Sequence, residues 1–168
     1  MKKFALSLIL LSICFQLNAQ ERDSIIHSEI IAHIWKPFKT SFDSKDSKTF
    51  NSIHTKDVLR INRWGIKQGD VYKNRITKSY NSASKRTRII SFWIEQSVFS
   101  ETYSHQIGYY AVTYKEPNKK DKTTYAQFQV TLKKVNDVWK IWQDFDSEIV
   151  GGKKVDSTFI KQLKKLKL

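Results

Sequence analysis

Residues 124–147 have the sequence TYAQFQVTLKKVNDVWKIWQDFDS. Apolar and polar side chains alternate on both sides of Asn136-Asp137, a dipeptide typical of tight turns, so this segment predicts a β-hairpin. Trp139 and Ile141 fall on one face of the second strand and indicate that this face covers a core. The hairpin therefore predicts a sheet that is buried on one side.

The rest of the chain supplies helices before the sheet and further strands within it. Residues 24–42 have apolar side chains about every four positions, which predicts an amphipathic helix with a kink or a break at Pro37. Strands are predicted over residues 58–64, 89–99 and 107–115. Two short helices are expected as well, one after a cap at Asp46 or Ser47 and one over residues 70–80. This order predicts an α+β fold with helices packed on one face of a curved antiparallel sheet.

Residues 1–19 have the features of a signal peptide: two lysines, an apolar run over residues 4–15 that is short for a membrane span, and Ala19 at the cleavage position. We therefore expect an exported protein, periplasmic or secreted. A lipid anchor on Cys14 is disfavoured because the bulky Ile13 precedes it. Cys14 is the single cysteine, so the mature chain has no disulfide or thiol chemistry.

We expect one domain over residues 20–150, followed by a basic amphipathic tail over residues 151–168. The net charge of +14 becomes +12 when the two lysines of the signal peptide are removed. The lysines are spread along the sequence, so we expect a solvated basic surface attracted to anionic polymers or lipids and no nucleic-acid partner. The tail predicts either a helix that contacts anionic lipid or one that packs back on the domain, and a frayed end is the other alternative.

Several features together resemble the nuclear transport factor 2-like superfamily, nearest to its SnoaL-like and ketosteroid-isomerase-like branches. They are a first helix that ends at Phe38 and Phe42, a turn at Asp46, Asp57 leading into a strand, and the closing WKIWQD of residues 139–144. The resemblance implies a cone-shaped curved antiparallel sheet wrapped around N-terminal helices, with an open pocket at the wide end. Members of the superfamily include isomerases, dehydratases and domains that catalyse nothing.

The resemblance does not extend to the residues that perform acid–base chemistry in the family. The general base of the ketosteroid isomerases would fall near Asn62, whose amide cannot accept a proton at neutral pH. Where the SnoaL-like branch often has histidines in its last strand, this chain has Gln143 and Phe145. We therefore predict no catalytic residue.

Strand alternation predicts which side chains line the pocket. Gln96, Tyr110 and Gln143 are expected to face inward as polar groups among apolar ones. Asn62 is added from the family comparison and His105 from its place at the end of a strand, where the alternative is a solvated residue. Asn62 conflicts with the apolar alternation of its own strand, which puts the neighbouring leucine and isoleucine inward instead. A core filled by its own side chains, with no pocket, is the other alternative.

Charge is expected outside this pocket. Asp144 falls on the polar face of the last strand and is predicted to point outward. The four histidines are too far apart for a helical metal pair, so we predict no metal and no cofactor.

The sequence thus favours a domain that binds a small apolar ligand without catalysis. We also expect a homodimer through the outer sheet face bearing Trp142, Gln127 and Gln129. An acid–base enzyme of the isomerase or dehydratase type, and a protein that acts at the envelope surface through its basic tail, are the alternatives.

Overall fold

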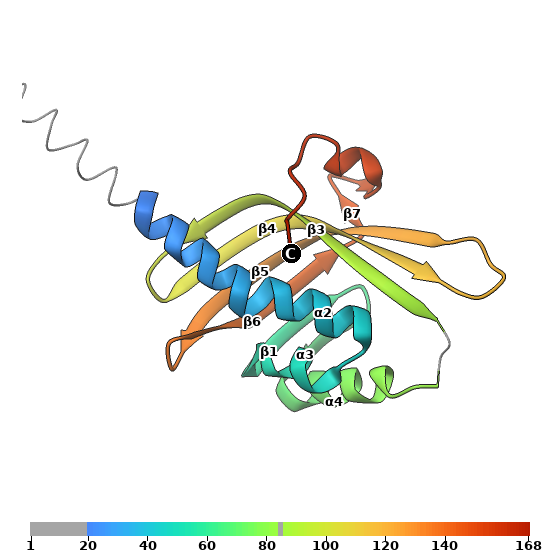
Figure 1. Cartoon of the computed structure of the whole chain (residues 1–168), viewed down its shortest axis with the longest axis horizontal. Helices are drawn as coiled ribbons and strands as arrows, with labels where there is room; N and C mark the ends of the chain where they lie inside the picture. The colour runs from blue at the N-terminus through green and yellow to red at the C-terminus, as the bar shows by residue number, and fades with distance from the viewer. Residues whose placement is uncertain (1–19, 84–85) are drawn as a thin grey trace, which may run out of the picture.

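The computed structural model of the chain describes residues 20–83 and 86–168, so the expected signal peptide over residues 1–19 lies outside the described residues. Residues 20–30 are α-helical and continue through a π-helical turn, η1 (Ile31–Trp35), into α2 (Lys36–Ser44). Figure 1 shows these segments as one long helix that lies along the sheet.

Pro37 does not break this helix. It lies in the first turn of α2, directly after the π-turn, in which the N–H of Lys36 donates to the carbonyl of Ile31 five residues earlier. The wider turn relieves the clash between a proline ring and the carbonyl four residues before it, so the helix stays continuous. Asp46 then caps α3 (Ser47–Ser52), as expected, by accepting a hydrogen bond of 3.0 Å from the N–H of Thr49.

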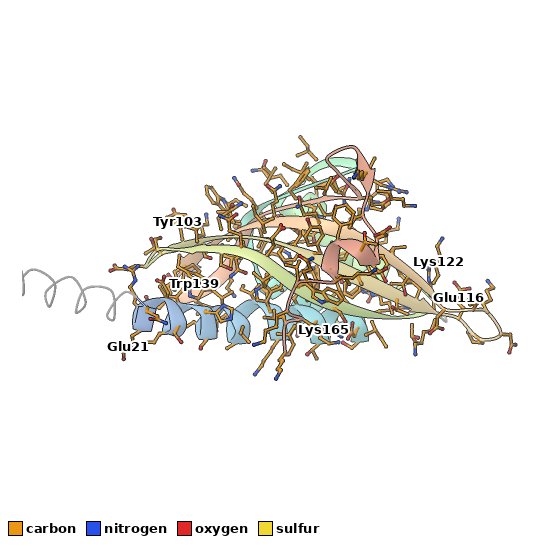
Figure 2. The ribbon with its side chains drawn as sticks, turned by 90° about the horizontal axis from the view of Figure 1, so that it is seen from above. Glu21, Tyr103, Glu116, Lys122, Trp139 and Lys165 are labelled. Carbon is orange, nitrogen blue, oxygen red and sulfur yellow. The ribbon has the colours of Figure 1, made fainter. Side chains whose placement is uncertain are left out.

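Six strands of the described residues form one sheet in the order β2-β1-β6-β5-β4-β3. The strands are β1 (His54–Asn62), β2 (Gly65–Gln68), β3 (Thr87–Phe99), β4 (Tyr103–Lys115), β5 (Lys122–Val135) and β6 (Val138–Ser147), with α4 (Gly69–Tyr80) between β2 and β3. The long helix runs along one side of this sheet (Figure 2). The predicted α+β class is confirmed. One pair departs from the expected antiparallel order, because β1 runs parallel to β6.

The predicted hairpin is present as β5 and β6. Asn136 and Asp137 have φ values of 51° and 59°, as a tight turn of the kind that joins antiparallel strands requires. Trp139 and Ile141 are completely buried. The first part of β6 therefore has the orientation that the sequence predicts.

Two β-bulges change the orientation of the side chains that follow them. In the β5–β6 pair the partners of Thr131 and Leu132 are Gln143 and Ile141, so Trp142 is an extra residue. In the β3–β4 pair a second register shift falls between Ile94 and Gln96. Since side chains alternate along a strand, one extra residue moves all later ones to the opposite face. Gln143 and Gln96 are exposed for this reason, and the expectation that they point inward is wrong.

The long helix packs its apolar stripe into the concave face of the sheet. Ile34 and Trp35 are 0% and 1% exposed, and the Trp35 ring lies 4.8 Å from that of Phe92. The indole N–H of Trp35 donates to the side-chain oxygen of Gln106 at 2.9 Å, which satisfies the one polar atom of this buried ring. The core thus fixes the helix against the centre of the sheet.

The tail does not form the expected amphipathic helix. It contains the short strands β7 (Ile149–Val150) and β8 (Lys153–Lys154) and the four-residue helix η2 (Ser157–Ile160). The N–H of Leu166 donates to the carbonyl of Phe92 at 2.9 Å, so the end of the chain pairs with the outer edge of β3. Phe159 covers Tyr109, with 5.7 Å between the ring centroids. The unpaired edge and the apolar contacts of the sheet hold the tail in extended form.

No helix in the part of the chain that the structure describes is long and apolar enough to span a bilayer.

His54, the first residue of β1, is buried as a neutral imidazole. Its Nδ1 lies 2.7 Å from the carbonyl oxygen of Phe50, so Nδ1 carries the proton and donates it. Its Nε2 is buried without a hydrogen-bond partner among the described residues. Burial lowers the pKa of His54 from 6.5 to about 3, because a second ring proton would have no acceptor.

This burial predicts that acid destabilises the protein through His54. The unfolded chain takes up the proton below about pH 6.5 whereas the folded chain does so only near pH 3, so stability is lost as the pH falls through this range. We expect His54 alone to reduce the free energy of unfolding by about 2 kcal/mol between pH 7 and pH 5. Urea denaturation at the two pH values measures this, and His54→Gln should lose about 2 kcal/mol less over the same interval. An equal pH dependence in both proteins would contradict the assignment.

Candidate functional site

A cavity of about 300 Å³ lies between the helices and the concave face of the sheet. Its walls are largely aromatic. The rings come from the long helix, α3, α4 and strands β3 to β5: Trp35, Phe38, Phe42, Phe50, Tyr72, Tyr80, Phe92, Tyr110, Tyr114 and Phe128. The lining also includes the exposed side chains of Arg63, Trp64 and Arg75, which mark its opening. A space of this size and lining suits a small molecule with an apolar body.

One wall of the cavity is charged. Arg60 of β1 lies beside two carboxylates of β6: its Nη1 is 2.6 Å from Oδ1 of Asp144, and its Nη2 contacts Oδ2 of Asp146. The hydroxyl of Tyr110 donates to the same oxygen of Asp146 at 2.7 Å. The parallel pairing of β1 with β6 sets this contact, because Arg60 and Asp144 are direct partners in the register. We call these four residues the Arg60 cluster.

The Arg60 cluster is buried and carries one more negative charge than positive charge when Arg60 and both aspartates are ionised and Tyr110 is protonated. The side chains of Arg60, Asp144 and Asp146 are 16%, 9% and 11% exposed. Burial raises the pKa of Asp144, Arg60 opposes this shift and Asp146 adds to it. Burial, together with Asp146, also raises the pKa of Tyr110, so its hydroxyl stays protonated and donates. The cluster can therefore hold a proton on Asp144 at a higher pH than an ordinary aspartate does.

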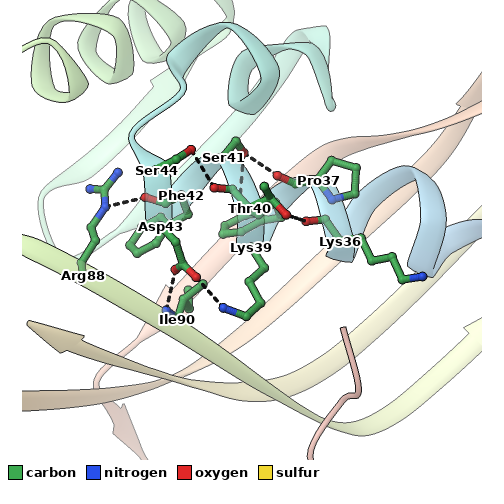
Figure 3. Close-up of polar contacts among 11 residues, drawn as sticks. Lys36, Pro37, Lys39, Thr40, Ser41, Phe42, Asp43, Ser44, Arg88 and Ile90 are labelled. Carbon is green, nitrogen blue, oxygen red and sulfur yellow. Dashed lines mark hydrogen bonds and ion pairs between the residues drawn. The ribbon is translucent and has the colours of Figure 1, made fainter.

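A second polar group lines the cavity where α2 meets β3. Nε of Arg88 donates to the carbonyl oxygen of Phe42 at 2.8 Å, and its guanidinium carbon lies 3.9 Å from the ring centre of Phe42 and 4.2 Å from that of Tyr80. Asp43 accepts a hydrogen bond of 2.8 Å from the N–H of Ile90. Figure 3 shows the two hydrogen bonds, which join the end of α2 to the edge of β3. The bond from Nε and the two ring contacts fix the guanidinium between the rings of Phe42 and Tyr80.

The structure separates the five candidate site residues into two groups. Asn62 and Tyr110 line the cavity. Gln96, His105 and Gln143 are exposed and are not part of its lining. His105 lies on the outer face, with Nδ1 3.2 Å from the hydroxyl of Thr131. Ligand binding by Asn62 and Tyr110 stays a prediction.

The orientation of β1 follows the family comparison. Arg60 and Asn62 line the cavity, whereas Leu59 and Ile61 do not. The apolar alternation of this strand is present, but its apolar face is the convex one, where both side chains are half-buried. The prediction that Leu59 and Ile61 point inward is therefore wrong.

Sequence reasoning missed the Arg60 cluster. Asp144 is buried and lines the cavity, so the prediction that it points outward is wrong, and so is the prediction that charge lies outside this pocket. The reason is the extra residue Trp142, which turns both aspartates inward. One signal was present: Arg60 and the Asp144-x-Asp146 pair have opposite charges at strand spacing, which is compatible with neighbouring strands.

In the ranges that the structure describes, no group of three or more histidine, cysteine, aspartate or glutamate side chains is arranged to hold a metal ion.

No protein-family model matches the sequence, and no curated protein sequence matches it. Solved structures do match the fold. A nuclear transport factor 2-like protein of unknown function from Shewanella oneidensis is 17% identical, with a TM-score of 0.60 over 72% of this chain and 98% of that one. A nuclear transport factor 2-like protein from Novosphingobium aromaticivorans is 11% identical, with a TM-score of 0.61 over 85% and 92% of the two chains.

A proposed scytalone dehydratase from Novosphingobium aromaticivorans is 16% identical, with a TM-score of 0.58 over 73% of this chain and 84% of that one. At these identities the likeness concerns the fold. The chain has the cone fold of the nuclear transport factor 2-like superfamily.

Proposed function

We propose that this domain binds a small molecule with a flat apolar body inside the cone. The observation that carries the proposal is the cavity of about 300 Å³ with aromatic walls and a buried charged cluster in one of them. A core with a structural role alone is normally filled by its own side chains, and buried charges are retained where they contact something polar. The predicted export and the predicted homodimer stay predictions.

The aromatic walls favour an apolar or aromatic ligand. Phe38 and Phe92 meet edge to face, with 5.3 Å between their centroids, and Trp35 lies 5.2 Å from Phe128. Such rings supply large contact areas with little loss of side-chain freedom on binding. The Arg60 cluster adds a hydrogen-bonding surface for a polar group on the same ligand. The proposed ligand is therefore amphipathic, which is more specific than the apolar ligand that the sequence predicts.

The neutral fluorescent dye N-phenylnaphthylamine tests the proposal. We expect a saturable increase in its emission with the folded protein. Ile76→Trp should weaken this binding about tenfold or more, because Ile76 of α4 lines the cavity and the larger ring would occupy part of it. Val71→Trp is the matched control, since Val71 lies on the same helix, is 68% exposed and does not line the cavity. Equal affinity in both variants would show that the dye binds elsewhere.

Acid–base catalysis is the second candidate, and the position of Asp144 favours it. Asp144 lines the cavity, and the described residues contact its Oδ1 through Arg60 but make no hydrogen bond to its Oδ2. A carboxylate with a raised pKa in a partly dry cavity is suited to moving a proton. In this role Asp144 would exchange the proton, and Tyr110 with Arg60 would hold Asp146 in place.

The raised pKa of Asp144 gives a direct prediction. In a carbon-13 NMR titration of the carboxyl groups, the resonance that Asp144→Asn removes should titrate above the ordinary aspartate value of about 3.9. If Asp144 also acts as a base, ligands with an acidic C–H should exchange that hydrogen in deuterated water with the parent protein and not with Asp144→Asn. Titration at or below the ordinary value would exclude the acid–base candidate.

A further inference from the structure

Arg88 presents a buried donor to the cavity that no acceptor satisfies. Its Nη2 is inaccessible to solvent and makes no hydrogen bond with any described residue, although Nε is anchored on Phe42. The hydroxyl of Tyr80, whose ring packs against the guanidinium, is likewise buried, and its proton has no acceptor within the described ranges. Both residues line the cavity. A charged donor left unpaired in this way is costly, which points to an acceptor that arrives with a ligand.

The carboxylates near Arg88 have other partners. Asp43 pairs with Lys39 through one oxygen and accepts the N–H of Ile90 through the other, as Figure 3 shows. The acids that line the cavity are Asp144, Asp146 and Glu148, and they pair with Arg60 and Arg63. No acidic side chain of residues 20–83 or 86–168 forms an ion pair with Arg88.

The opening of the cavity adds positive charge to the lining. Lys67 and Arg75 belong to the lining, and neither forms an ion pair with a carboxylate in the ranges that the structure describes. Burial raises the pKa of Tyr80 although neighbouring Arg88 opposes the shift, so its hydroxyl stays protonated as a donor. Two buried donors therefore lie at one end of the cavity and two further cations line its opening, and together they favour an anion.

We propose that the ligand of this cavity carries a carboxylate, which accepts hydrogen bonds from Nη2 of Arg88 and from the hydroxyl of Tyr80. The inference rests on the proposed binding function and narrows the ligand to a flat apolar acid. Arg88 is suited to this role because its guanidinium is held by Nε and by two rings before the ligand arrives, so little freedom is lost when it binds an oxygen.

Two dyes that differ by one anionic group test this inference. N-phenylnaphthylamine is neutral, and anilinonaphthalenesulfonate has the same aromatic skeleton with a sulfonate that stands in for the carboxylate. We expect the parent protein to bind the sulfonate dye more tightly. In Arg88→Gln the sulfonate dye should bind about tenfold more weakly, with the affinity for the neutral dye changed less than about twofold. Arg86→Gln is the matched control, because it removes the same charge two residues away at a side chain outside the cavity lining.

Arg88→Gln also removes the hydrogen bond to the carbonyl oxygen of Phe42. If this loss lowers the melting temperature, Tyr80→Phe is a second variant that leaves that bond in place. It removes one hydroxyl whose proton has no acceptor among the described residues, so it should weaken only the sulfonate dye. The inference is overturned if the parent protein has no preference for the sulfonate dye, if Arg88→Gln keeps the preference, or if Arg86→Gln loses it equally. Failure of the neutral dye to bind the parent protein would instead reject the proposed binding function, and the carboxylate inference with it.

Discussion

Trp142, the extra residue of β6, turns every later side chain of that strand to the other face of the sheet. Its own ring stays on the outer face, where the indole N–H donates to Asp57 at 3.1 Å and the ammonium group of Lys133 lies 4.6 Å from the ring centre. These contacts hold the bulge from the convex side. On the concave side the result is that Asp144 and Asp146 meet Arg60, so the charged wall of the cavity depends on one irregularity in the ladder of hydrogen bonds.

Burying the Arg60 cluster is a poor way to stabilise a fold. Each charge loses its hydration, and the attraction of the pair returns about as much as that loss, so a well-packed apolar replacement is often at least as stable. The cluster is also unbalanced, because Asp144 and Asp146 share a single guanidinium. An unbalanced, buried cluster that lines a cavity is typical of a site that binds a ligand or moves a proton, and this is the physical basis for both candidate functions.

Alternation and turn chemistry were enough to predict the α+β class and the place of Tyr110 in the cavity lining. The helix over residues 24–42, the cap at Asp46 and the turn at Asn136-Asp137 each follow from local rules, and local rules are reliable where the backbone is regular. The faces of β3 and β6 were predicted correctly as far as the bulges and wrongly after them. A bulge depends on pairing with a neighbouring strand and on its packing, neither of which appears in the strand's own sequence.

The structure of the tail and the Arg60 cluster were not predicted because both depend on contacts between segments that are distant in the sequence. Residues 153–168 have a spacing of apolar side chains that fits a helix, yet the edge of β3 offers hydrogen bonds to an extended chain, and this tertiary contact outweighs a weak local preference. Arg60 looked like the solvated face of a strand because arginine is seldom buried. It is buried here because β1 runs parallel to β6 and brings its partners alongside, which no local pattern could have shown.

The cavity has two polar ends, and their separation restricts what can bind. Arg88 pairs with Tyr114 across β3 and β4, and Phe92 pairs with Tyr110, whose hydroxyl joins the Arg60 cluster. These two pairs are four positions apart along the strand, a distance of roughly 13 Å along the sheet. At the Arg88 end, hydrogen-bond donors outnumber acceptors, whereas the Arg60 cluster has one more carboxylate than it has cations. A molecule that spans both would lie with its acid group toward Arg88 and a hydrogen-bond donor or an acidic C–H toward Asp144. The same orientation therefore serves binding and proton transfer.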